Sequence, residues 1–194
     1  MALQAYDWIE FYAKTTPKKR AMYDLASGRD YSYAQMHERV ARTAGMLREK
    51  GIQPGDRVAF LCLNTTDVME LIFGCWRIGA VCLALNFRLT PPELAYILND
   101  SDTSMVLVDV PFAPLAEATQ SLTSVQHWVN TDGVGGISEY EAGLADADPI
   151  YDYHPQSLED QCLLMYSSGT TGSPKGVIIT HAICLLYTSP SPRD

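Results

Sequence analysis

The sequence lacks the cysteine and histidine patterns that build disulfide frameworks or zinc sites. Its five cysteines are an odd number with no C-x-x-C spacing, and Cys62, Cys82 and Cys162 lie within apolar runs typical of strands. The four histidines are scattered along the chain, outside metal-ligand spacing of one another. We therefore expect reduced, buried thiols and no metal site built by this chain alone.

Long apolar runs and basic residues are also scarce. No segment reaches the roughly 18 apolar residues of a membrane span, and the first ten residues lack the basic flank and apolar stretch of a signal peptide, so we expect a cytoplasmic protein. Residues 101–194 carry 2 basic and 12 acidic side chains, and the net charge of the chain is −9. This balance argues against a nucleic-acid partner, because such binding depends on lysines and arginines that displace counterions from phosphates.

What the sequence does contain is an alternation of helical and strand patterns. With 47% hydrophobic residues in 194, the chain is long enough for one sizeable core. Apolar runs at 58–63, 80–85 and 105–108 predict strands, and amphipathic stretches between them predict helices. Near-continuous apolar strands separated by such helices indicate an α/β fold with a parallel-rich sheet buried on both faces.

Two of the expected helices have clear ends in the sequence. Ser32 and Gln35 form a capping box, and Gly51 ends that helix. Thr90 is an N-cap followed by Pro91 at the first helical position and by a reciprocal Glu93. The pattern in residues 110–160 is weaker, and there we expect a helix near 114–121, a strand at 125–130 and an acidic loop at 146–160.

The most informative segment is Y-S-S-G-T-T-G-S-P-K-G-V at residues 166–177. Its three glycines let backbone N–H groups approach a ligand, its five serine and threonine hydroxyls can each donate a hydrogen bond, and Lys175 adds a positive charge. This composition predicts a loop that binds a polyphosphate.

The loop differs from a Walker A motif. Counted from Gly169, Pro174 stands where the second glycine belongs, and the lysine is followed by a β-branched run instead of a helix. The predicted loop therefore joins two strands, at 162–166 and 177–179. A phosphate ligand there would lie beyond a strand's carboxyl end, where ligands of parallel sheets bind.

The segment S-S-G-T-T-G-x-P-K-G-V, followed by Thr180-His181, resembles the signature of the adenylate-forming (AMP-binding) ligases, which include acyl-CoA synthetases. Residues 51–59, G-I-Q-P-G-D-R-V-A, are similar to a turn that these enzymes share, and residues 79–101 resemble the fatty-acyl-CoA ligase branch. Ala84 departs from the family, which has proline there, and this change weakens a turn without affecting the chemistry.

The resemblance implies specific partners and roles. The family uses ATP, Mg²⁺ and coenzyme A to convert a carboxylic acid into an acyl-adenylate and then into an acyl-CoA. In this chain the phosphate-binding residues implied are Ser167, Ser168, Gly169, Thr170, Thr171, Gly172 and Lys175. The family's catalytic residues lie beyond the matched segments, so the resemblance assigns none here. His181 is expected to begin a helix, because no nucleophile or acid lies near it in the sequence.

The domain boundaries and the activity of the chain are expectations as well. We expect residues 1–181 to form part of the N-terminal AMP-binding domain and residues 182–194, which end in T-S-P-S-P-R-D, to be a non-native tail. Such a fragment of an acid-CoA ligase would be inactive by itself. Two alternatives stay open: a fragment of an adenylation domain that loads a carrier protein, and a non-enzymatic phosphate-binding or interaction module.

Overall fold

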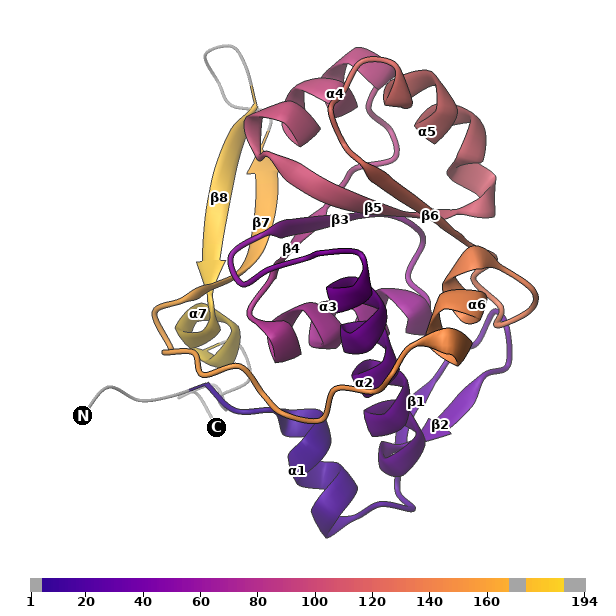
Figure 1. Cartoon of the computed structure of the whole chain (residues 1–194), viewed down its shortest axis with the longest axis vertical. Helices are drawn as coiled ribbons and strands as arrows, with labels where there is room; N and C mark the ends of the chain where they lie inside the picture. Colours follow the sequence, from indigo (N-terminus) through magenta and orange to yellow (C-terminus); the bar gives the residue numbers. More distant parts are fainter. Residues whose placement is uncertain (1–4, 168–173, 187–194) are drawn as a thin grey trace, which may run out of the picture.

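The computed structural model describes residues 5–167 and 174–186, and Figure 1 shows their arrangement around a central sheet. In this part of the chain a six-stranded sheet has the order β6-β5-β3-β4-β7-β8. All neighbouring strands are parallel except β7 and β8, which form an antiparallel hairpin at one edge. The strands are β3 (Arg57–Leu61), β4 (Val81–Ala84), β5 (Thr103–Asp109), β6 (His127–Thr131), β7 (Gln161–Ser167) and β8 (Lys175–Thr180).

Helices cover both faces of this sheet. One face carries α2 (Tyr33–Glu49), α3 (Thr66–Ile78) and α6 (Glu139–Asp146), and the other carries α4 (Pro91–Asp100) and α5 (Ala113–Gln120), which follows the short 3₁₀ helix η1 (Val110–Phe112). Helix α1 (Trp8–Thr15) packs on α2, and α7 (His181–Leu186) follows β8. The prediction of an α/β fold with a parallel-rich sheet is confirmed.

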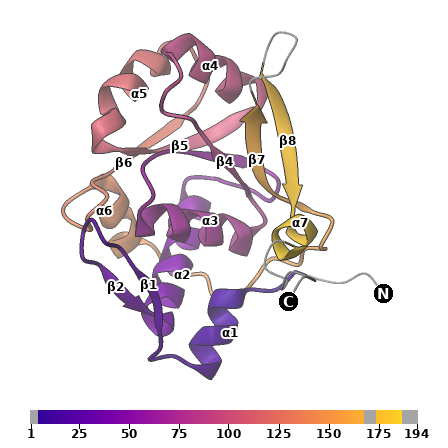
Figure 2. The ribbon, with the colours of Figure 1, turned by 180° about the vertical axis from the view of Figure 1, so that it is seen from behind.

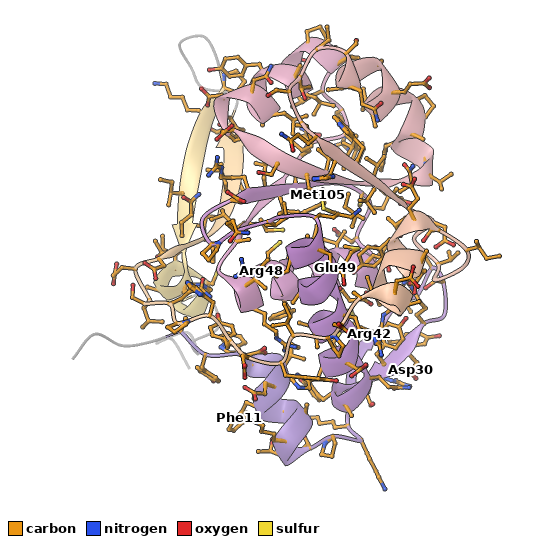
Figure 3. The ribbon with its side chains drawn as sticks, in the orientation of Figure 1. Phe11, Asp30, Arg42, Arg48, Glu49 and Met105 are labelled. Atoms are coloured by element: carbon orange, nitrogen blue, oxygen red, sulfur yellow. The ribbon has the colours of Figure 1, made fainter. Side chains whose placement is uncertain are left out.

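The central strands alternate strictly between two hydrophobic cores. Along β5, Met105 and Leu107 face α2 and α3, whereas Val106 and Val108 face α4 and α5. Met105 is fully buried, and Figure 3 labels it at the level of the sheet. Because the apolar residues of these strands belong alternately to one core and the other, a shift of one residue in register would exchange the two sets of side chains.

The helix ends follow the predicted signals. Ser32 and Gln35 form the expected capping box at the start of α2, and Thr90 and Glu93 form one at the start of α4. Gly51 after α2 and Gly79 after α3 both have positive φ, at 82° and 79°, which glycine adopts without steric cost.

Other elements were not predicted. Strands β1 (Arg20–Tyr23) and β2 (Asp30–Ser32) form a small antiparallel sheet beside α2, and helix α6 lies within the region of weak pattern. After α6 the chain runs from the edge strand β6 toward the opposite edge of the sheet, where it enters β7. This crossover lies against α2, where the Ile150 N–H donates to the Ala41 carbonyl at 2.9 Å.

Two remaining expectations concern the chain's ends and membranes. Helix α7 extends across the expected boundary between residues 181 and 182, and residues 187–194 lie outside the described residues, so the non-native tail stays a prediction. Among the residues that the structure describes, no helix has both the length and the apolar character needed to cross a membrane.

Candidate functional site

The predicted phosphate-binding loop is closed by the β7–β8 hairpin. Ser167 is the last residue of β7 and Lys175 the first of β8, and the two are directly paired across the ladder. The prediction that the loop joins two strands is therefore confirmed. Among the other predicted site residues, Ser168, Gly169, Thr170, Thr171 and Gly172 lie outside the described residues.

A pocket lies between the end of this hairpin and helix α4. Its volume is about 430 Å³, and it is lined by Asn86, Leu89, Glu93, Ile97, Tyr166, Ser167 and Pro174. Asn86 follows the carboxyl end of β4, and Ser167 ends the neighbouring parallel strand β7. The pocket thus lies at the edge of the sheet where the topology predicts ligand binding.

Tyr166 joins the hairpin to the helix across this pocket. Its hydroxyl donates to Asp100 Oδ2 at 2.6 Å, and its ring packs against the core formed with α4. Burial and the Asp100 carboxylate both raise the pKa of Tyr166, so the phenol stays protonated as a donor at neutral pH. The sequence analysis includes Tyr166 only as the first residue of the 166–177 segment and gives it no role.

The loop before α4 and the first turns of α4 form the opposite wall of the pocket. The Glu93 carboxylate accepts hydrogen bonds from the Thr90 N–H at 2.8 Å and the Thr90 hydroxyl at 2.6 Å. These bonds, the hydroxyl first, lower the pKa of Glu93, which is ionised at neutral pH. Two nearby carboxylates, Glu93 and Asp100, are thus engaged by protein donors, while Lys175 is exposed.

His181 lies at the far end of β8 from Lys175 and begins α7, as expected. Its side chain is buried, its Nε2 is 3.1 Å from Gln156 Oε1, and its ring meets Trp76 at a centroid distance of 5.3 Å. Burial lowers the pKa of His181, so the neutral ring is favoured. These contacts indicate that His181 packs α7 against the body of the domain.

Sequence reasoning missed a set of buried charges on α3. Asp67, Glu70 and Arg77 are completely buried, although their residue types predict a solvated helix face. A signal was available, because Gly74 lies on the same flank of α3, and a Cβ there would come within 2.7 Å of Thr43 Cγ2 on α2. A glycine among charged residues in a helix can mark close contact with another helix.

The three buried charges have ionic partners from distant parts of the chain. Asp67 pairs with Arg29, Glu70 with Arg39, and Arg77 with Asp7. All three pairs lie within the body of the domain and none lines the pocket beside the hairpin. We assign them to stability and not to ligand binding.

Residues 5–167 and 174–186 contain no cluster of three or more histidine, cysteine, aspartate or glutamate side chains arranged to hold a metal ion. This part of the chain therefore does not supply a carboxylate cage of the kind that binds a divalent cation by itself.

Comparison with known proteins gives a consistent result. A family model described as AMP-binding enzyme matches residues 9–189. Feruloyl-CoA synthase from Amycolatopsis sp is 43% identical over 175 residues, which cover 90% of this chain and 33% of that protein. The chain spans about a third of the length of the curated relatives that it matches.

Solved structures agree with the fold. The inhibitor-bound N-terminal domain of FACL13 from Mycobacterium tuberculosis superposes with a TM-score of 0.78 and 31% identity, covering 89% of this chain and 43% of that one. The anthranilate CoA ligase AuaEII, in complex with anthranoyl-AMP, gives a TM-score of 0.80 and 26% identity, covering 93% of this chain and 36% of that one. The fold is that of the N-terminal domain of adenylate-forming enzymes, and the chain belongs to the ligase family of AMP-binding enzymes.

Proposed function

We propose that this chain holds the β- and γ-phosphates of ATP in an acid-CoA ligase. In that reaction a carboxylate oxygen attacks the α-phosphorus of ATP, pyrophosphate leaves, and the acyl-adenylate then passes its acyl group to the sulfur of coenzyme A with release of AMP. The observation that carries the proposal is the Ser167–Lys175 pair, which closes the glycine- and hydroxyl-rich loop at the ligand-binding edge of the sheet.

The residues of the loop have distinct roles in this proposal. Glycines at 169 and 172 leave room for backbone N–H groups to approach the phosphates. The hydroxyls of Ser167, Ser168, Thr170 and Thr171 donate hydrogen bonds to phosphate oxygens. The ammonium group of Lys175 offsets the negative charge that grows on the leaving pyrophosphate. Mg²⁺ is assigned no ligand from the described residues and would reach the site bound to the nucleotide.

The substrate proposal rests on the relatives. Feruloyl-CoA synthase and the anthranilate ligase act on aromatic acids by their names, and this chain resembles the fatty-acyl branch in residues 79–101. We therefore include aromatic and fatty acids as candidate substrates. We propose coenzyme A as the acyl acceptor. Product analysis with coenzyme A and with a carrier protein distinguishes this acceptor from the alternative.

The experiment is acid-dependent ATP–pyrophosphate exchange by the protein that the complete gene encodes. Exchange should depend on an aromatic or fatty acid, and Lys175→Ala should lower its kcat/KM by at least about tenfold, since a hydrogen bond to a charged group contributes about 1.5–3 kcal/mol. Lys18→Ala, which removes an exposed lysine remote from the hairpin, is the matched control and should leave the exchange unchanged. Absence of exchange with every acid, or equal rates for Lys175→Ala and the wild type, would contradict the proposal.

A further inference from the structure

The end of the β7–β8 hairpin extends beyond the strand that supports it. Strand β4 pairs with β7 as far as Met165, whereas β8 pairs with β7 as far as Ser167. Two pairs, Tyr166 with Gly176 and Ser167 with Lys175, therefore lie past the last pairing between β4 and β7. Their placement relative to the body depends on side-chain contacts, and both views show this end of the hairpin beside α4 (Figures 1 and 2).

On the α4 side, the contact is made by Tyr166. Its ring packs with the core beneath α4, and its hydroxyl donates to Asp100 Oδ2 at 2.6 Å. Asp100 is the last residue of α4, and the more N-terminal Glu93 and Ile97 line the pocket that Tyr166 also lines. One side chain thus ties the hairpin end to the helix that forms the opposite wall of the site.

The ring of Tyr166 also lies close to its cross-strand partner. A Cβ added to Gly176 would lie 3.5 Å from Tyr166 Cζ and 3.3 Å from Leu164 Cδ1, so the two side chains of β7 occupy the space beside this glycine. An aromatic ring over a cross-strand glycine compensates for the missing side chain in a strand pair. On the opposite face, Met165 of the same strand is 44% exposed and gives little comparable support.

We infer that Tyr166, through its hydrogen bond to Asp100 and its packing against Gly176, is a positioning residue that fixes Ser167 and Lys175 for binding of the nucleotide phosphates. The ligand in this inference rests on the proposed function above. The inference that Tyr166 holds the hairpin in place does not depend on the ligand. It follows from the hydrogen bond that the Tyr166 hydroxyl donates to Asp100 at the end of α4.

The first test measures ATP affinity by calorimetry in the presence of Mg²⁺. Tyr166→Phe and Asp100→Ala should each weaken binding by about three- to tenfold, and the double variant should lose no more than either single one, because both remove the same hydrogen bond. Tyr96→Phe is the matched control, since Tyr96 is an exposed tyrosine on the same helix and outside the pocket. It should bind ATP as the wild type does.

The second test measures hydrogen exchange of the backbone amides. In Tyr166→Phe the amides that bond across the hairpin in its two end pairs, Tyr166–Gly176 and Ser167–Lys175, should exchange faster, because successive antiparallel pairs alternate between bonded and non-bonded. Amides of β7 before Met165, where β4 still supports the strand, should be unchanged. Unchanged exchange at the hairpin end overturns the inference, as do additive losses of affinity in the double variant. Faster exchange with unchanged ATP affinity would show that Tyr166 stabilises the hairpin end without affecting nucleotide binding, and this result also overturns the inference.

The two proposals fail in different ways. If the wild type binds no ATP, the proposed function is contradicted and Tyr166 loses its role toward phosphates, whatever the exchange data show. If the wild type binds ATP and Lys175→Ala weakens the binding, but Tyr166→Phe changes neither affinity nor exchange, then the proposed function stands and the role of Tyr166 is wrong.

Discussion

Helix α3 and the β7–β8 hairpin differ in how many contacts hold their side chains in place. On α3, Asp67, Glu70 and Arg77 are each fully buried and paired with a charged partner from another element. On the hairpin, Val177 and Ile178 are 48% and 58% exposed, and Ser167 is exposed as well. The charged side chains of α3 form ion pairs with three separate segments of the chain, whereas the end of the hairpin contacts α4 through Tyr166.

This contrast shows that the contacts that restrict side-chain motion are concentrated on α3. Arg77 alone contacts three segments: its Nε lies 2.9 Å from Asp7 Oδ2, and its Nη1 lies 3.4 Å from the carbonyls of both His37 and Ile150. A ligand-binding site needs rigid support and also access for its ligand. If the proposed nucleotide site is correct, the α2–α3 layer supplies the support and the hairpin supplies the access.

The largest expected effect comes from breaking the α3 network at Arg77. Arg77→Met leaves the Asp7 carboxylate buried without a countercharge, and loss of one partner of a buried pair costs about 3–5 kcal/mol of unfolding free energy. Urea denaturation monitored by circular dichroism measures this loss.

Two companion variants sharpen the test of Arg77. The double variant Arg77→Met with Asp7→Asn should recover part of the stability, because no unpaired charge remains. Arg20→Met breaks an ion pair with Asp30 at the surface and should leave stability unchanged. Equal effects of Arg77→Met and Arg20→Met would remove the contrast between buried and exposed pairs.

An intermediate effect is expected from the pH dependence of Glu70. Burial raises the pKa of Glu70 from 4.5 to about 7, although Arg39 at 2.6 Å opposes the shift. Other polar groups that face this carboxylate are Asp67, whose charge raises the pKa, and Tyr140, which donates to it at 3.0 Å.

The sign of this dependence follows from proton binding. Because the folded protein holds the Glu70 proton more tightly than the unfolded chain, the contribution of Glu70 is complete below pH 4.5 and is lost as the pH rises to about 7. Urea denaturation from pH 4.5 to 8 should therefore show that the wild type's advantage over Glu70→Gln declines across this window. A constant difference would contradict the shift.

Glu93→Gln is the control for that measurement. The pKa of Glu93 is lowered from 4.5 by its bonds to Thr90, so its contribution is present above pH 4.5 and is lost only in more acidic solution. The difference between the wild type and Glu93→Gln should be constant from pH 5 to 8.

The smallest effect is expected on the exposed strand β8. Val177→Thr and Ile178→Thr replace side chains that are about half exposed, and each should change the unfolding free energy by no more than about 0.5 kcal/mol. Both should lower self-association measured by light scattering, because they make an edge strand more polar. A loss of stability comparable to that of Arg77→Met would show that β8 is covered in solution.

Much of the fold could be predicted because local signals agreed with the tertiary arrangement. The capping residues Ser32 and Thr90 and the glycines at 51 and 79 mark helix ends by their own backbone preferences. The β1–β2 sheet could not be predicted in this way, since its strands are short and half exposed and carry no long apolar pattern.

The site shows the same division. The hairpin that pairs Ser167 with Lys175 could be predicted because a glycine- and hydroxyl-rich segment lies between two apolar runs, and the phosphate-binding role of both residues stays a prediction. The contact between Tyr166 and Asp100 could not be predicted, since the two residues are 66 positions apart and meet only when β7 pairs with β4. The partners of Asp67 and Glu70 are likewise set by tertiary packing, which no local pattern reports.

The crossover between β6 and β7 has a consequence for the order in which the chain folds. Trp76 Nε1 donates to the carbonyl of Cys162, 86 positions later, and the crossover between them binds α2 through Ile150 and the Arg77 carbonyl through the His154 N–H at 2.7 Å. Closing so large a loop is entropically costly until these intermediate contacts exist. We expect the nucleus to form among α2, α3 and β3–β5, with the hairpin joining afterwards, so the segment proposed to bind ATP is the last part of the sheet to assemble.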